Sequence, residues 1–311
     1  RVLKDDGTLW LNLGDSYSSG GRTTTTNQSV RGDKDYGVTR PPPVEGIKPK
    51  DLFGIPWRVA FALQADGWYL RQDIIWNKPN PMPESVQDRC TKAHEYIFLL
   101  SKSPHYYFDN VAIKEETTTF DNSNRDRDTT KLNNTPGRTK MAGLKTNQYE
   151  TRNKRSVWTV NTKPYKEAHF AVFPTDLIEP CVLAGSSAKI CSGCGKAYKR
   201  EMVTTDVPDR IVRDHMVGVI PKRDKPSRMN SKDMLPLTKE DNGFVKQCNC
   251  DTDKTEQDRI IDPFGGSGTT ALVADRHNRD ATVIELNEQY IEIAKNRLEG
   301  DAPLFAKVEV S

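Results

Sequence analysis

The sequence predicts an α/β fold in which a mostly parallel sheet carries helices on both faces. The β-branched pair at 260–261 leads into a glycine-rich turn at 265–268, and a helix is expected to begin near Thr269. Residues 281–285 predict a second strand, and residues 289–298 carry apolar side chains at helical spacing. This strand–turn–helix–strand–helix order is typical of parallel sheets covered by helices.

Further elements are expected upstream of this unit. Residues 52–63 have apolar side chains at helical spacing, so they predict a helix with Trp57 and Phe61 in the core. Residues 69–76 and 96–100 are rich in β-branched and aromatic residues, which predicts two strands.

The glycine-rich turn is the best indication of a ligand. Its glycines let backbone approach a bound molecule, and the helix that follows offers unpaired N–H groups with a partial positive charge. Glu285 ends the next strand, where a carboxylate can bind ribose hydroxyls. A P-loop would need Lys after Gly268, and a dinucleotide fingerprint needs G-x-G-x-x-G, so neither fits. The turn therefore predicts an adenosine-like ligand; the alternative is a tightly packed corner without one.

Asp262-Pro263-Phe264, standing ahead of Gly266-Ser267-Gly268-Thr269-Thr270, resembles the cofactor motif of the amino-methylating DNA methyltransferases, which bind S-adenosylmethionine. Similar blocks occur at residues 7–17, 74–81, 94–100 and 169–178. The resemblance implies a Rossmann-like sheet. It also implies cofactor binding by Asp262, Pro263, Phe264, Gly266, Ser267, Gly268, Thr269, Glu285, Phe173 and Pro174.

The motif order resembles the class in which the catalytic half precedes the cofactor half. That class implies a tetrapeptide (Asp/Asn/Ser)-Pro-Pro-(Tyr/Phe/Trp) upstream of residues 7–17, and none is present. The only consecutive prolines, at 41–43, lie between Arg40 and Val44 and lack both the acceptor and the aromatic ring. We therefore expect an N-terminal piece to be absent from this sequence, with the catalytic residues unknown and the chain as written able to bind cofactor without turnover.

The activity implied by the resemblance is methyl transfer from S-adenosylmethionine to the exocyclic amine of cytosine (N4) or adenine (N6) in duplex DNA, as in restriction-modification or phage modification systems. Cytosine N4 is preferred over adenine N6, but only weakly, because the residue that would help to decide between the two bases is the first of the missing tetrapeptide. Two alternatives remain open. One is a non-catalytic DNA-binding relic or subunit that retains the cofactor fold, and the other is a methyltransferase of RNA or a small molecule.

Composition narrows the class of protein. The 311 residues have a net charge of +3 and a mean hydropathy of −0.72. No apolar run approaches the roughly 18 residues that cross a bilayer, and no secretion signal is visible, so we expect a cytoplasmic protein without a membrane partner. The net charge is too slight to indicate nucleic-acid binding by itself, and the oligomeric state is left open.

A basic segment supplies the indication of DNA binding. Between residues 121 and 155, nine Lys and Arg accompany four Asp and Glu, with few apolar residues. Such a segment cannot build its own core, so a disordered loop is one interpretation. The other is contact with DNA phosphates, and in the family resembled this region carries target recognition. The predicted DNA-binding residues are Arg125, Arg127, Lys131, Arg138, Lys140, Lys145, Arg152, Lys154 and Arg155.

The cysteines give a separate signal. Cys191, Cys194, Cys248 and Cys250 form two close pairs, and four thiolates can close a tetrahedral zinc site. The C-x-C spacing and the long stretch between the pairs depart from the usual pattern, so unpaired thiols are the alternative. We accordingly divide the chain into a catalytic half (1–115), a basic recognition segment (116–157), a cofactor-side segment (158–187), a zinc-binding insert (188–257) and an S-adenosylmethionine-binding half (258–311).

Overall fold

The computed structural model describes residues 2–18, 46–116, 151–163, 172–204, 239–302 and 307–310. The chain forms two compact units, each built from separate stretches of sequence. Unit 1 comprises residues 1–108, 155–186 and 259–311, and unit 2 comprises residues 109–154 and 187–258. The predicted zinc-binding insert (188–257) belongs to unit 2, as does the predicted recognition segment (116–157) except for residues 155–157.

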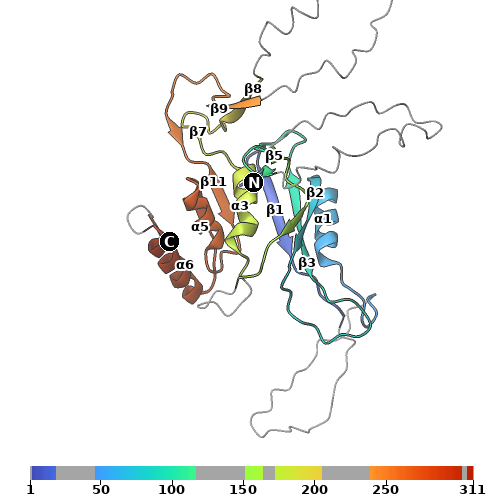
Figure 1. The fold of residues 1–311 in the computed structure, drawn as a ribbon. Helices are drawn as coiled ribbons and strands as arrows, with labels where there is room; N and C mark the ends of the chain where they lie inside the picture. Colours follow the sequence, from blue (N-terminus) through green and yellow to red (C-terminus); the bar gives the residue numbers. More distant parts are fainter. Residues whose placement is uncertain are drawn as a thin grey trace, which may run out of the picture. The chain divides into compact units, whose positions relative to one another are not determined.

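The larger sheet of unit 1 has four strands in the order β1-β3-β2-β6. They are β1 (Thr8–Leu13), β2 (Tyr69–Asn77), β3 (His94–Ser101) and β6 (Val157–Thr159). Figure 1 labels β1, β2 and β3 of this sheet. β3 runs antiparallel to both β1 and β2, whereas β2 and β6 are parallel. The expectation of a mostly parallel sheet is therefore wrong here, because the chain turns back after β2 and inserts β3 between two strands of the opposite direction.

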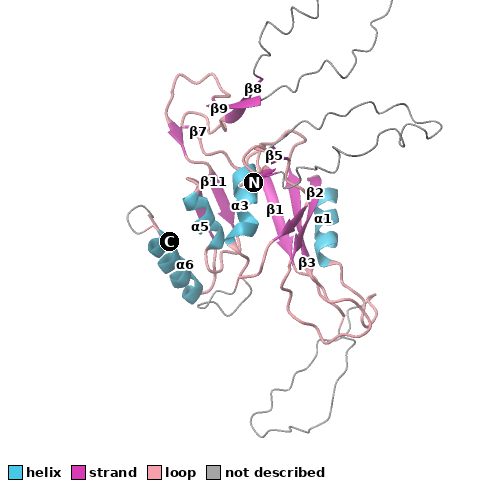
Figure 2. Cartoon of the chain, viewed as in Figure 1, coloured by secondary structure: helices cyan, strands magenta, loops and turns pink. Residues whose placement is uncertain are grey.

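Helices cover both faces of this sheet, as the sequence predicted. On one face Ala60 of α1 (Ile55–Ala65) packs with Phe98 and Leu100 of β3. On the other face Leu177 of α3 (Thr175–Gly185) packs with Ile97 of β3, which directly precedes Phe98, and with residues of strand β2. Successive residues of β3 thus pack against opposite helices. Figure 2 shows these helices in cyan and the strands in magenta.

One core assignment in α1 fails. The Trp57 ring lies 4.9 Å from that of Phe98 in an edge-on contact, so Trp57 does pack on the core. Phe61, however, is 55% exposed. Phe61 follows Trp57 by four residues, slightly more than one helical turn, so its side chain is turned from Trp57 toward the edge of the buried face.

The predicted strand–turn–helix–strand–helix unit is confirmed in the last part of unit 1. It consists of β11 (Arg259–Asp262), α5 (Thr269–Arg276), β12 (Asp280–Val283) and α6 (Glu288–Asp301). β11 and β12 are parallel, with Ile260 opposite Ala281. Arg279, 7% exposed, joins this unit to the end of α3, since its guanidinium donates to the carbonyl oxygen of Ser186 at 2.9 Å. None of the described helices is long and apolar enough to span a membrane.

Unit 2 contains three antiparallel strand pairs among its described residues. β4 (Glu115–Glu116) pairs with β5 (Thr151–Arg152), β7 (Ile190–Cys191) pairs with β10 (Thr255–Glu256), and β8 (Lys199–Thr204) pairs with β9 (Lys239–Val245). The β8–β9 pair is the longest of the three and forms a two-stranded ribbon, with Cys194 before β8 and Cys248 after β9 in the chain.

Candidate functional site

The glycine-rich turn between β11 and α5 is held by its own backbone and by Asp262. The Asp262 carboxylate accepts from the N–H of Phe264 at 2.9 Å and from the hydroxyl of Thr270 at 2.5 Å. Gly266 and Gly268 have φ angles of 50° and 73°, in the left-handed region that favours glycine. The residue types predicted here are therefore required by the shape of the turn itself.

Glu285 joins the end of the second strand to this turn. Its Oε2 accepts from the N–H of Gly266 at 2.8 Å, and its Oε1 accepts from the N–H groups of Leu286 and Asn287, each at 2.9 Å. The N–H of Asn287, and then those of Gly266 and Leu286, stabilise the ionised form and hold the pKa of Glu285 below its ordinary value. A carboxylate has about four acceptor positions, so it can still accept a hydroxyl.

A pocket of about 360 Å³ opens beside the turn and Glu285. That volume lies within the usual range for small-molecule sites of about 300–1,000 Å³. The residues that line it are Val172, Phe173, Phe264, Gly265, Gly266, Ser267, Thr269, Glu285, Asn287 and Tyr290. We call it the turn pocket.

The structure brings six of the predicted cofactor residues together around the turn pocket: Phe173, Phe264, Gly266, Ser267, Thr269 and Glu285. The other four support the walls or lie beside them. Asp262 and Pro263 belong to the turn, Gly268 precedes the first residue of α5, and Pro174 precedes α3. Val172, Gly265, Asn287 and Tyr290 line the pocket without having been predicted to do so.

Arg297 of α6 is a supporting residue that the sequence motif does not reveal. Its guanidinium donates to the carbonyl oxygen of Ser267 at 3.2 Å, to the Ser267 hydroxyl at 3.1 Å and to the Thr269 hydroxyl at 2.8 Å. Ser267 and Thr269 are 3% and 2% exposed. Both hydroxyls are therefore held by Arg297, so these residues shape the pocket chiefly through their backbone.

Comparison with known proteins assigns this sequence to a family. The DNA methylase family with N6 and N4 specificities matches residues 1–189 and 250–296. The chain belongs to this DNA methylase family. It is 38% identical over 301 residues to Type II methyltransferase M.Cfr9I of Citrobacter freundii, covering 97% of this chain and 68% of that protein. It is 40% identical to Type II methyltransferase M.SmaI of Serratia marcescens, covering 96% and 69%.

A solved structure is also similar. PvuII DNA methyltransferase (cytosine-N4-specific) aligns over 99% of this chain and 67% of its own, with a TM-score of 0.48 and 14% identity. The match to the family leaves out residues 190–249 of this methylase chain, a stretch that includes three of the four paired cysteines.

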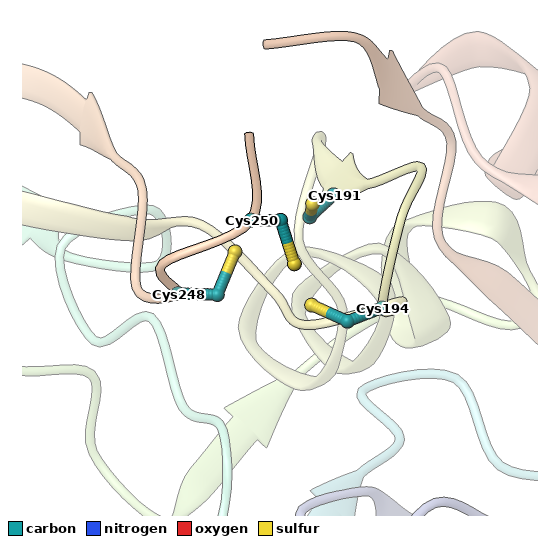
Figure 3. Close-up of side chains that lie close together, drawn as sticks. All are labelled: Cys191, Cys194, Cys248 and Cys250. Atoms are coloured by element: carbon teal, nitrogen blue, oxygen red, sulfur yellow. The ribbon is translucent and has the colours of Figure 1, made fainter. Parts of the chain in front are cut away.

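The four paired cysteines converge within unit 2. Figure 3 shows their side chains directed toward one another from two chain segments. Their sulfur atoms all lie within 4.8 Å of one another. The N–H of Gly193, and then that of Cys194, donates to the sulfur of Cys191 and lowers the pKa of this thiol to about 7.

The backbone around the first pair forms a tight knuckle. Gly195 has a φ angle of 69°, and its N–H donates to the carbonyl oxygen of Cys191 at 2.8 Å. On the second segment, Lys246 Nζ donates to the carbonyl oxygens of Cys250 and Thr252 at 2.6 and 2.7 Å. Both turns are thus fixed by hydrogen bonds that orient the thiols inward.

Most of the predicted DNA-binding residues cannot be placed. Arg125, Arg127, Lys131, Arg138, Lys140 and Lys145 lie outside the described residues. Arg152 lies in β5 and forms an ion pair with Glu115 at 3.3 Å. Lys154 and Arg155 follow it along the chain, and the carbonyl oxygen of Arg155 accepts from Trp158 Nε1 at 2.8 Å.

A polar cluster lies where β2 ends. Lys78 Nζ bonds Glu95 Oε1 and lies 4.1 Å from the centre of the Trp76 ring. Asn12 of β1 donates to Glu95 Oε2 at 3.2 Å. β1 and β2 are both antiparallel to β3, so their carboxyl ends meet at the same edge of the sheet. Ligands of open α/β sheets bind at such an edge.

Proposed function

We propose that this chain binds S-adenosylmethionine in the turn pocket and transfers its methyl group to an exocyclic amine, cytosine N4 or adenine N6, in duplex DNA. The observation that carries the proposal is the Glu285 carboxylate bonded to the Gly266 N–H at the carboxyl ends of two adjacent parallel strands. Membership of the DNA methylase family supports the reaction class.

The residues of the turn pocket suit this cofactor. Glu285 has acceptor capacity for ribose hydroxyls, and the glycines admit the ligand close to the backbone. Phe264 is 83% exposed and offers an aromatic face beside the turn. When bound, the cofactor would supply an electrophilic methyl group on a sulfonium; the chain's part is to hold and orient it.

The target side follows from the chemistry of the amine. Its lone pair is delocalised into the base, so acceptors must align it and water must be excluded. The base must also leave the duplex stack, at a cost of about a few kcal/mol. We assign the loop after β2 to the wall beside the flipped base, because Lys78 is fixed there by Glu95 and Trp76.

The proposal predicts saturable binding of S-adenosylmethionine by this chain. It predicts incorporation of labelled methyl groups into mixed-sequence duplex DNA when a segment that carries the tetrapeptide (Asp/Asn/Ser)-Pro-Pro-(Tyr/Phe/Trp) is supplied, because these 311 residues contain none. Calorimetric titration measures the first and a filter assay measures the second. Digestion of the methylated DNA to nucleosides would then distinguish N4-methylcytosine from N6-methyladenine. Failure of the folded protein to bind S-adenosylmethionine would refute the proposal.

The two alternatives give other results in the same assays. Cofactor binding and salt-sensitive duplex binding, with no methyl transfer even after the tetrapeptide segment is supplied, would favour a DNA-binding relic or a subunit that needs a partner. Methyl transfer to single-stranded RNA in preference to duplex DNA would favour an RNA enzyme. We expect duplex DNA to be preferred over single-stranded RNA, and the affinity for duplex DNA to fall steeply as the salt concentration rises.

We also propose that the cysteine cluster binds one structural Zn²⁺. A tetrahedral site with Zn–S bonds of about 2.3 Å separates its sulfur atoms by about 3.8 Å. The four sulfur atoms already lie within 4.8 Å of one another, so a small inward movement would complete the site. Four thiolates fill every coordination position of a tetrahedral zinc ion and leave none for water. Such a donor set is typical of structural zinc sites rather than catalytic ones.

Metal analysis of the purified protein should therefore find about one zinc per chain, and Cys194→Ser should reduce this strongly. Cys90→Ser is the matched control, because both thiols are exposed and only Cys194 belongs to the cluster. Equal zinc content in the two variants, or a folded wild-type protein without metal, would refute the site.

A further inference from the structure

Arg200 joins two segments of unit 2 that are far apart in the sequence. Its Nε donates to both carboxylate oxygens of Asp109, at 3.0 and 3.3 Å, and its Nη1 bonds Asp241. The guanidinium carbon also lies 4.6 Å from the centre of the Phe244 ring. The Asp109 side chain is 4% exposed and that of Arg200 is 21% exposed. Removal of one partner from an ion pair withdrawn from water in this way leaves the other charge uncompensated, which strongly destabilises the fold.

Asp109 in turn fixes the backbone that leads to β4. Its Oδ1 accepts from the N–H groups of Val111 and Ala112, at 3.1 and 3.2 Å. β4 follows, and Glu115 pairs with Arg152 of β5 both in strand register and through the side-chain ion pair. β4 lies at the start of the predicted recognition segment (116–157) and β5 lies within it, so Arg200 anchors the start of that segment to β8.

The cysteine cluster lies at the end of the ribbon that carries Arg200. Lys199 opposite Val245 and Arg200 opposite Phe244 are the first pairs of the β8–β9 register. Cys194 precedes β8 in the chain, and Cys248 follows β9. A metal held by both cysteine pairs would therefore fix the separation of the two strands next to Arg200.

We propose that Arg200 is a positioning residue through which the metal site sets the placement of the β4–β5 pair, whose second strand carries the predicted DNA-binding residue Arg152. The connection runs from the metal to the β8–β9 ribbon, through Arg200 to Asp109, and from Asp109 to the β4–β5 pair. Its DNA part rests on the proposed methyltransferase function and its metal part on the proposed zinc site, whereas the link from Arg200 through Asp109 to β4 and β5 rests on neither. Binding of duplex DNA thus depends on the metal, and binding of S-adenosylmethionine does not, since every residue that lines the turn pocket belongs to unit 1.

The test compares Arg200→Gln with Arg276→Gln. Arg276 is also held by two hydrogen bonds to carboxylate oxygens, from Nε and Nη2 to the two oxygens of Asp301, at 2.8 and 2.5 Å, but in unit 1. Arg200→Gln should speed amide hydrogen exchange at residues 111–116 and 151–153. It should also raise the Kd for duplex DNA by about tenfold, the factor expected for the loss of one hydrogen bond to a charged group. The Kd for S-adenosylmethionine should not change. Arg276→Gln should alter neither the exchange in unit 2 nor the affinity for DNA.

Two further samples separate positioning from a general loss of folding. Arg200→Lys keeps the charge and loses the two-point geometry, so it should give an intermediate exchange rate and DNA affinity. Wild-type protein stripped of zinc by a chelator should show the same faster exchange at 111–116 as Arg200→Gln.

Each outcome decides a separate part of the proposal. Unchanged exchange at 111–116 in Arg200→Gln or in the stripped protein would overturn the connection, whatever happens to DNA binding. Faster exchange with unchanged DNA affinity would overturn the role in recognition. Wild-type protein that binds no duplex DNA would instead overturn the proposed function, and the exchange data would still test the mechanical link.

Discussion

Replacement of Glu285 by Ala should raise the Kd for S-adenosylmethionine by about ten- to a hundredfold. The carboxylate is the one acidic side chain among the residues that line the turn pocket. Hydrogen bonds to a charged acceptor contribute about 1.5–3 kcal/mol each, and 1.4 kcal/mol is a factor of ten. The variant also frees the N–H of Gly266, which Glu285 now holds, so part of the loss comes from a looser turn.

Two comparisons locate this effect in the pocket. Glu292→Ala removes a carboxylate from an exposed position on α6 that does not line the pocket, and its Kd should stay within about twofold of the wild type. Glu285→Gln retains an acceptor oxygen and should lie between the wild type and Glu285→Ala. Calorimetric titration measures all three. Equal affinities for wild type and Glu285→Ala would mean that the cofactor binds elsewhere.

The helices and strands that the sequence indicated, at 52–63, 69–76, 96–100 and 260–298, were predictable because each depends on side chains that are close together in the sequence. The strand expected at 69–76 is β2 (Tyr69–Asn77), and the helix expected at 289–298 lies within α6 (Glu288–Asp301). The direction of β3 was not predictable. Apolar alternation is the same in a parallel and an antiparallel strand, and the direction depends on how residues 78–93 return the chain.

The same limit applies to the candidate sites. Glycines and an acid at a known spacing indicate the turn pocket, since the motif itself builds the turn. Arg297 could not be found in this way, because its partners Ser267 and Thr269 lie about one helix and one strand earlier in the chain. Likewise, Asp109 and Arg200 are 91 positions apart, and no short pattern connects them.

Replacement of Gly268 by Ala should lower the free energy of unfolding of unit 1 by about 2–5 kcal/mol. A Cβ at this position would lie 2.8 Å from the Cβ of Ala294 in α6, closer than two carbon atoms approach without displacement. Overpacking of this kind costs about 1–3 kcal/mol. The φ angle of 73° adds roughly 1–2 kcal/mol for any residue other than glycine. Because Gly268 leads into α5, the shift should also disturb the turn pocket and weaken cofactor binding.

Two variants divide this effect into its causes, with denaturant unfolding of unit 1 as the measurement. Gly300→Ala also adds a methyl group to a glycine, but in α6, where nothing lies within 4 Å of the new Cβ, so it should stabilise by about 0.5–1 kcal/mol. Ala294→Gly alone should destabilise by about 1 kcal/mol through helix propensity. Combined with Gly268→Ala it removes the close contact, so the double variant should be more stable than the sum of the single effects. Simple additivity would show that α6 does not press on the turn, and the loss in Gly268→Ala would then come from the left-handed backbone alone.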